Sequence, residues 1–140
     1  MSRIILPLYS YSNNKKYVHE RSGLNHWNAR GRVRNYNEVY IPIPKKGRDN
    51  FFGFFPDRNE SFLLKTDNGI VMSAKVCQEN DKALMSNPNS DLGQWILRDV
   101  LNIPIGKVVE YIDLLRIGYD SVVITKNNYS QYYIEPSSIG

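Results

Sequence analysis

The sequence predicts a single β-rich α+β domain over residues 1–140, with many short strands and two short helices. Its β-branched and aromatic segments are short and are separated by turn residues, which is typical of antiparallel sheets. Two other segments have apolar residues at helical spacing. The length suits one domain, and a hydrophobic content of 41% is normal for a globular chain. Together these observations favour a compact barrel or sandwich.

Two strands are predicted in the N-terminal part. The first covers Arg3–Ser10, and the second covers Val39–Pro44, which is rich in β-branched and aromatic residues. Pro42 and Pro44 lack amide donors and occupy alternate positions. We therefore expect the second strand at an edge of the sheet, or paired on one side only.

Two hairpins are predicted later in the chain, joining 61–66 to 70–76 and 121–126 to 129–135. In the first, the sequence Asn68-Gly69 supplies the positive φ angles of a tight turn. The second turns at Asn127-Asn128, and its return segment has the aromatic residues of a strand.

The two helices are predicted over 91–101 and 110–117. The apolar residues of the first share one face at three- and four-residue spacing: Leu92, Trp95, Ile96 and Val100. Asp91 is a suitable N-cap, with Gln94 three residues later. The second helix is expected to stop at Gly118, which adopts a left-handed conformation easily.

Two stretches fit no regular element, namely residues 21–37 and 78–89. The first has four arginines, several asparagines and no hydrophobic period, and the second is polar apart from Ala83-Leu84-Met85. Long irregular loops on a compact scaffold are usually functional.

The charge is distributed unevenly along the chain. Residues 1–50 carry ten Lys and Arg against three acidic residues, whereas residues 51–140 carry eight against eleven. The halves are therefore +7 and −3, which gives the net +4 of the whole chain. This asymmetry indicates a surface that meets a polyanion, although chance clustering on a solvated surface produces the same pattern.

The chain lacks the sequence signs of a secreted or membrane protein. Cys77 is the only cysteine, so neither an internal disulfide nor a cysteine zinc cluster can form. The N-terminus has no signal-peptide cleavage site, and no apolar run is long enough to span a bilayer. We expect a cytoplasmic protein with no membrane partner.

Catalytic signatures are also missing. No lysine has an acidic residue two positions before it, as the common metal-dependent nuclease motif requires, and neither His19 nor His26 has a lysine two positions after it. Gly106-Lys107 is followed by valine rather than by the hydroxyl residue of a phosphate-binding loop. The sequence thus predicts a domain with no catalytic centre and no cofactor. One alternative stays open, a small metal-dependent nuclease in which scattered acids converge: Asp57, Glu60 and Asp67.

Residues 25–35 hold the side chains that read DNA. Arginine can donate two parallel bonds to guanine, and asparagine can bond adenine in the same bidentate way. Arg30, Arg32 and Arg34 alternate along this segment and could divide between base edges and phosphates. A second alternative is an RNA or single-strand binder that stacks bases on exposed aromatic rings. Its candidate rings are Tyr9, Tyr11, Trp27 and Tyr36.

Several short motifs occur in a fixed order over residues 6–135. They begin with Ser22-Gly23-Leu24-Asn25, Arg32, Asn37-Glu38 and Tyr40-Ile41-Pro42-Ile43-Pro44. They continue with Phe54-Phe55-Pro56, then FLLKTDNG at 62–69, then Gln78, Lys82-Ala83, Asn89, Leu92-Gly93 and Arg98, and finally Asp113-Leu114, Gly118 and Val122. In this order the chain resembles the DNA-binding domain of NgoFVII-like restriction endonucleases. It departs from the family where His26 precedes Trp27 and where Tyr119 follows Gly118.

The resemblance implies a DNA-binding pseudobarrel of the plant B-three type, related to the EcoRII effector and BfiI targeting domains. Such a domain binds double-stranded DNA in the major groove with two loop arms. Here the first arm would be residues 25–37 and the second arm residues 78–89. The chain would be the target-recognition domain of a prokaryotic restriction-modification enzyme. The nuclease domain, with any Mg²⁺ it needs, would lie elsewhere in the parent protein or complex.

The predicted DNA contacts combine this resemblance with the polar content of the two arms. In or beside the first arm they are Arg21, Asn25, His26, Trp27, Asn28, Arg30, Arg32, Arg34, Asn35 and Asn37. In the second arm they are Gln78, Asp81, Lys82, Met85, Ser86, Asn87 and Asn89, and Arg98 is added from the helix that follows. No catalytic or metal-binding residue is predicted.

Overall fold

The computed structural model describes residues 2–31, 34–44, 53–57, 60–77 and 83–138. Its strands are β1 (Ser2–Pro7), β2 (Ser10–Ser12), β3 (Lys15–Tyr17), β4 (Ile41–Pro42), β5 (Phe62–Thr66), β6 (Val71–Cys77), β7 (Ala83–Ser86), β8 (Ser121–Lys126) and β9 (Tyr132–Ser137). Its helices are the 3-10 helix η1 (Gly23–Asn28), α2 (Asn89–Gly93), the π-helix η2 (Gln94–Val100) and α3 (Tyr111–Ile117). None of the helices in these ranges is long and apolar enough to cross a membrane.

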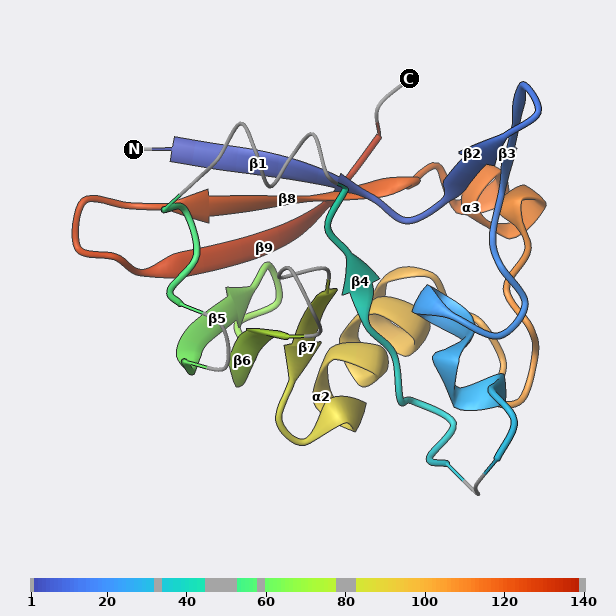
Figure 1. The fold of residues 1–140 in the computed structure, drawn as a ribbon, viewed down its shortest axis with the longest axis horizontal. Helices are drawn as coiled ribbons and strands as arrows, with labels where there is room; N and C mark the ends of the chain where they lie inside the picture. Colours follow the sequence, from blue (N-terminus) through green and yellow to red (C-terminus); the bar gives the residue numbers. More distant parts are fainter. Residues whose placement is uncertain (1, 32–33, 45–52, 58–59, 78–82, 139–140) are drawn as a thin grey trace.

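Within these residues, seven strands form one sheet in the order β1-β8-β9-β5-β6-β7-β4 (Figure 1). Neighbouring strands are antiparallel except β5 and β9, which run parallel. The two edge strands, β1 and β4, approach each other, so the sheet nearly closes. The predicted β-rich pseudobarrel with few short helices is therefore confirmed.

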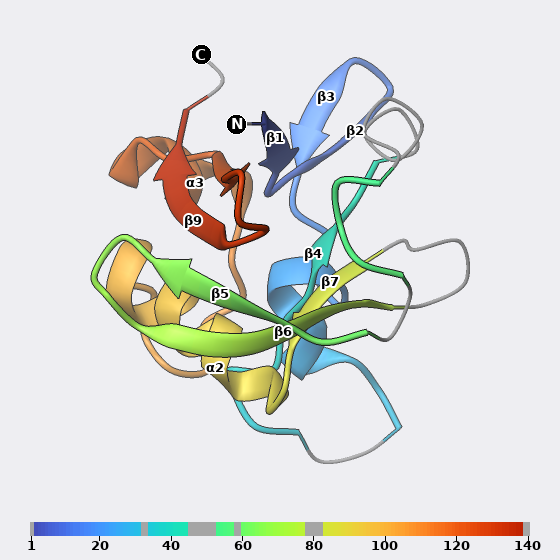
Figure 2. The same cartoon turned by 90° about the vertical axis from the view of Figure 1, so that its left-hand side faces the viewer.

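The core lies inside this curved sheet and is closed by the helices. Figure 2 shows α2 and the helix that follows it on one side of β5, β6 and β7. α2 and η2 together cover the predicted helix 91–101. Its apolar face is confirmed, because Leu92, Trp95 and Ile96 are fully buried and Val100 is 9% exposed. Nε1 of Trp95 donates a 2.9 Å bond to Oδ1 of Asp67, so this large side chain enters the core without leaving its polar atom unpaired.

The strand predictions hold with shifted boundaries. Among the strands that the structure describes, β4 pairs only with β7 and lies at the edge of the sheet, as the alternate prolines predict. In the first hairpin only Gly69 has a positive φ, 88°, so Asn68 does not supply the second left-handed residue expected of it. In the second hairpin the return strand begins at Tyr132, three residues late. Residues 127–131 form a longer turn, with a 3.0 Å bond from the amide of Asn127 to the carbonyl of Gln131.

The helices also differ at their starts. The first begins at Asn89 and its N-cap is Pro88, so Asp91 lies inside the first turn rather than capping it. α3 agrees with its prediction. Its N-cap, Glu110, forms a capping box with Asp113, and it ends at Gly118 with a φ of 92°.

Three structured segments occur where the sequence predicts a longer strand or no regular element. Residues 10–17 form a separate two-stranded ribbon, β2–β3, in place of the predicted end of the first strand. η1 occupies the start of the first arm. The interval 78–89 is not one irregular loop, because β7 pairs with both β6 and β4. A four-residue strand is too short to show a two-residue period clearly, which explains the error.

Candidate nucleic-acid interface

The first arm is fastened at its start by Asn25, which lies in η1 and is fully buried. Its Nδ2 donates 2.9 Å bonds to the carbonyls of His19 and Val109, and its Oδ1 accepts a 2.8 Å bond from the amide of Val109. The side chain thus joins the chain before the arm to the segment that precedes α3. Although Asn25 is a predicted DNA contact, this geometry favours a structural role.

Aromatic contacts hold the next part of the arm. The ring of Trp27 meets the ring of Tyr36 edge-on at 5.4 Å, which brings the two ends of the arm together. The ring of His26 packs in the same way on Tyr40, at 5.0 Å. Both Trp27 and His26 are half-buried, so each keeps some surface that a ligand could touch. Nδ2 of Asn28 donates a 3.0 Å bond to the carbonyl of Glu20, which ties η1 to the residues that precede it.

Arg98 fastens the end of the first arm. Its guanidinium donates to Oδ1 of Asn37 at 2.8 Å and to the carbonyls of Tyr36 at 3.1 Å and Ile103 at 2.6 Å. Burial lowers the pKa of this guanidinium from its ordinary value, but an arginine keeps its charge at neutral pH. Arg98 is a predicted DNA contact, but most of its donors bond to other parts of the protein, and two of these bonds hold the end of the first arm in place.

Asn37 connects the same site to the π-helix. Its Nδ2 donates a 3.2 Å bond to Oε1 of Gln94, next to Gly93. A Cβ on Gly93 would lie only 1.7 Å from the carbonyl oxygen of Asn37. Backbone and helix can approach this closely only because Gly93 has no side chain.

A buried carboxylate links the two arms. Glu38 is 5% exposed, and its Oε1 accepts a 3.0 Å bond from Nδ2 of Asn89, at the end of the second arm. Its Oε2 lies 3.7 Å from Nε of Arg34, whose side chain is only 12% exposed. Nη1 of Arg34 also donates a 2.8 Å bond to the carbonyl of Ala29. The predicted contacts Arg34 and Asn89 are thus directed into the protein.

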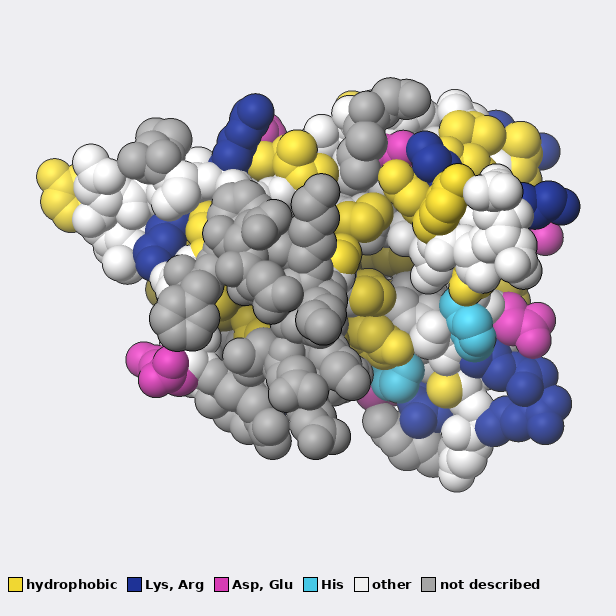
Figure 3. Space-filling view, turned by 45° about the horizontal axis from the view of Figure 1, so that its top comes forward, with side chains coloured by type: hydrophobic (Ala, Val, Ile, Leu, Met, Phe, Trp, Pro, Cys, Tyr) yellow, Lys and Arg dark blue, Asp and Glu magenta, His cyan; other side chains and the backbone are white. Residues whose placement is uncertain are grey.

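The exposed predicted contacts of the first arm form a smaller set. Arg30 and Asn35 are exposed, and Arg21 is half-buried at the base of the arm. Oδ1 of Asn35 accepts a 2.8 Å bond from the backbone amide of Asn37. Nδ2 of Asn35 is not used in this bond and can donate to a ligand. Arg32 lies outside the described residues. Figure 3 shows Lys and Arg side chains beside histidine side chains at this end of the molecule.

The second arm is only partly described, because Gln78, Asp81 and Lys82 lie outside the described residues. Met85 is half-buried in β7. Ser86 is fully buried, and its Oγ accepts a 2.8 Å bond from the amide of Leu92. Asn87 is exposed at the turn between β7 and α2, which the bond from Asn89 to Glu38 holds beside the first arm. Among the described second-arm residues, Asn87 is the most accessible candidate.

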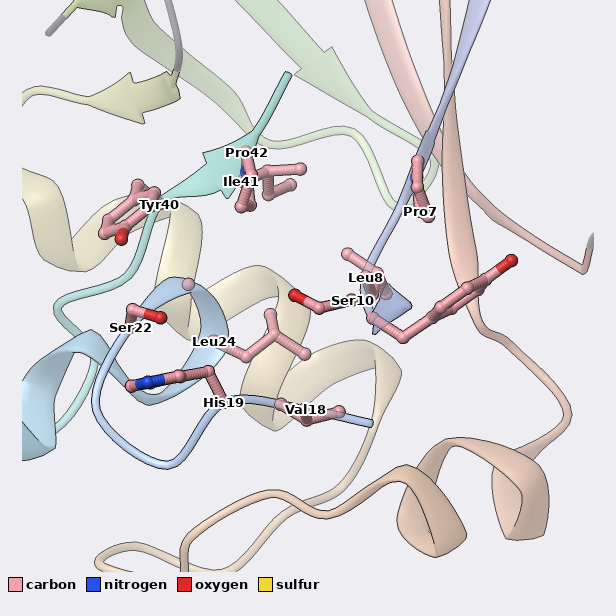
Figure 4. Close-up of a pocket in the computed structure, with 12 residues that line it drawn as sticks. Pro7, Leu8, Ser10, Val18, His19, Ser22, Leu24, Tyr40, Ile41 and Pro42 are labelled. Atoms are coloured by element: carbon pink, nitrogen blue, oxygen red, sulfur yellow. The ribbon is translucent and has the colours of Figure 1, made fainter. Parts of the chain in front are cut away.

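A small cavity of about 30 Å³ lies between Leu8, His19, Ser22 and Tyr40 (Figure 4). It has room for roughly one water molecule and is too small for a nucleobase. Neither Asp nor Glu lines it among the described residues, so His19 has no carboxylate there to orient it.

The described residues do not assemble a metal centre. No three of their His, Cys, Asp and Glu side chains lie close enough together to hold an ion. Asp57 and Glu60 are exposed, and Asp67 accepts its bond from the core residue Trp95. The scattered acids of the nuclease alternative are thus not gathered into a cluster in this part of the chain.

Sequence reasoning missed the residues that hold the arms. Glu38 and Asn37 carry the resemblance, but their bonding partners are 51 and 61 residues away, at Asn89 and Arg98. The sequence does not show why residue 93 must be glycine, because the reason is the close approach of the Asn37 backbone in the folded structure. For Glu38 the sequence offers two signals, its place in the resemblance and its position next to a predicted edge strand, and neither identifies its bonding partners.

Comparison with known proteins identifies a family for this chain. The family model for the NgoFVII C-terminal B3-like DNA-binding domain matches residues 4–128. This range contains the first arm, the second arm and all the helices. No curated protein matches the chain.

Proposed function

Because this chain belongs to the family of NgoFVII C-terminal B3-like DNA-binding domains, we propose that it is the target-recognition domain of a restriction endonuclease. In this proposal the domain binds one duplex sequence by placing both arms in the major groove. Its affinity comes largely from phosphates and its selectivity from base edges. The domain itself needs no cofactor.

The observation that carries the proposal is that side chains in and around the first arm divide into two groups, those bonded inside the protein and those exposed to solvent. Asn25, Arg34 and Arg98 are occupied by internal bonds, whereas Arg30 and Asn35 are exposed on the same clamped segment. Side chains that read bases must be held within a fraction of an ångström of the productive position. An arm fixed at both ends can present exposed donors in this way.

The second arm would contact the same duplex as the first arm. Asn87 is exposed beside the first arm, and the second-arm residues outside the described ranges add Gln78 and Lys82 to the same proposal. Two arms joined through Glu38 would move as one unit on the duplex. Arg21 at the base of the first arm suits a phosphate contact, because it is half-exposed and lies beyond the clamped segment.

Cleavage would belong to a nuclease domain in another part of the parent protein or complex. Mg²⁺, if the parent enzyme uses it, would be bound there rather than by this chain. A prokaryotic cytoplasm would be the place of action, since the sequence has one cysteine, Cys77, and cannot form the internal disulfides that are typical of oxidising compartments.

A selection from random duplexes tests the proposal. The purified chain should enrich one short duplex sequence and should prefer it over a scrambled duplex and over the matching single strand. If single strands compete as well as the duplex, the aromatic-stacking alternative replaces this one. If the chain cleaves its bound duplex in Mg²⁺ or Mn²⁺, the non-catalytic assignment is wrong.

Arg30→Ala then tests the first arm. If Arg30 contacts a base edge, the change should weaken specific binding by about 1–3 kcal/mol and relax the preference at one position. Arg116→Ala is the matched control, because Arg116 is 71% exposed but lies on α3. Equal effects of the two changes would show that the first arm does not read the sequence.

A further inference from the structure

The β2–β3 ribbon stands apart from the main sheet. Its strands pair with each other, Ser10 with Tyr17 and Ser12 with Lys15, and they join no other strand among the described residues. The turn is formed by Asn13 and Asn14, with φ angles of 51° and 63°. Two successive left-handed residues are typical of the tight turn that best matches strand twist. The ribbon is therefore a short, well-defined projection.

Packing explains only the base of this ribbon. Nζ of Lys16 lies 4.8 Å from the centroid of the Tyr9 ring, and that ring meets the Tyr111 ring edge-on at 5.7 Å. Beyond this anchor the strand residues are exposed, and Tyr11 is 64% exposed. An isolated two-stranded hairpin is marginally stable and adds almost nothing to the core here. Its side chains are thus available for an external partner.

The chemistry of the ribbon suits an anionic partner. Residues 1–19 contain neither Asp nor Glu, and the ribbon adds Lys15, Lys16 and the hydroxyl groups of Ser10 and Ser12. Lysine, serine and tyrosine side chains are common donors to DNA phosphates. A two-stranded ribbon is also narrow enough to lie along a DNA groove.

The ribbon is joined directly to the first arm. A five-residue strap, 18–22, leads from β3 into η1. The carbonyls of His19 and Glu20 accept bonds from Asn25 and Asn28, so the strap is fixed against η1. In Figure 1 the ribbon and the first arm lie at the same end of the molecule, one above the other. Figure 3 shows Lys and Arg side chains spaced along that end, with some acidic side chains between them.

From this arrangement we propose that the β2–β3 ribbon is a third DNA-binding element, which contacts phosphates beside the sequence read by the two arms. The inference rests on the proposed duplex binding. Lys15 is its principal contact, since Lys16 is partly occupied by the Tyr9 ring. The duplex held by the arms continues past the target, and the ribbon would bind this continuation whatever its sequence.

Lys15→Gln tests the ribbon in the full chain, by titration with the selected duplex at several salt concentrations. Losing one phosphate contact lowers the slope of log K against log salt by about 0.9, which corresponds to about eightfold weaker binding at about 0.1 M salt. The preference for the selected over the scrambled duplex should stay unchanged. Lys65→Gln is the matched control, an exposed lysine on β5 at the other side of the molecule, and should behave as wild type.

Duplex length supplies an independent measurement. The wild-type chain should bind a duplex with about ten extra flanking base pairs more tightly than the bare target, and Lys15→Gln should lose most of this gain. Wild-type affinity and salt slope in Lys15→Gln would overturn the inference. So would a changed base preference, which would mean that the ribbon reads sequence. If the wild-type chain does not bind duplex at all, the proposed function fails first, and the two failures are thereby distinguished.

Discussion

Asn25→Ala tests whether Asn25 has a structural role or a DNA-reading role. The sequence predicts a DNA contact at this residue, whereas the structure buries its side chain. The change removes three hydrogen bonds, those to the amide and carbonyl of Val109 and to the carbonyl of His19. It leaves those backbone groups without their partner at a fully buried position. Each orphaned group costs about 1 kcal/mol or more. We therefore expect about 3 kcal/mol of lost stability, which lowers the melting temperature of a domain this size by about 10 °C.

Thermal unfolding followed by circular dichroism measures this loss. Asn25→Asp is the informative companion, because it keeps the shape but loses both donated bonds and buries a charge. We expect it to destabilise at least as strongly as the alanine change. Below its melting transition, Asn25→Ala should keep the base preference of the wild type. A melting temperature within about 2 °C of wild type, together with an altered base preference, would refute the structural assignment.

Four further results are expected. Gly93→Ala should lower the melting temperature and weaken specific duplex binding, since its Cβ would meet the Asn37 carbonyl at 1.7 Å; wild-type binding would contradict the described packing. Glu38→Gln should destabilise the domain by about 3 kcal/mol, because it removes the buried negative charge that lies 3.7 Å from Nε of Arg34. Combined with Asn89→Ala it should cost less than the two changes added together, a non-additivity measured by urea unfolding. Burial of Asp113 opposes ionisation, but bonds from Lys107 and the Glu110 amide outweigh it and lower the pKa of this carboxyl. Ionised Asp113 therefore contributes to the free energy of unfolding above the ordinary aspartate pKa, and this contribution is lost as the pH falls through the lowered pKa. Asp113→Asn should consequently make the free energy of unfolding less dependent on pH in the acid range. Duplex affinity should fall steeply with salt, with a slope of about 0.9 per phosphate contact, whereas a flat response would mean that the basic half does not face DNA.

Elements with a strong local signal were predictable from the sequence. The buried face of 92–100 follows from three- and four-residue spacing, and the end of α3 follows from Gly118. The edge position of β4 follows from the missing amide donors of its prolines. In each case the signal lies within a few residues of the element that it predicts.

The candidate site was less predictable because its support is long-range. The polar residues 25–37 were identified as an arm, yet only tertiary contacts decide that Arg34 and Arg98 point inward while Arg30 points outward. β7 was missed because four residues give almost no periodic signal, although pairing on both sides makes the strand stable. The residue types of the loop predict that it can bind DNA, but they do not predict which of its polar side chains stay exposed to do so.

A competition titration tests whether the chain binds duplex DNA with sequence selectivity. A labelled duplex from the random selection is bound by the purified chain at about 0.15 M salt without divalent metal. Scrambled duplex and the corresponding single strand are then added as competitors. We expect both to compete at least about a thousandfold less well than the unlabelled selected duplex, the lower range for specific DNA-binding proteins. Equal competition by the scrambled duplex or by the single strand would contradict it.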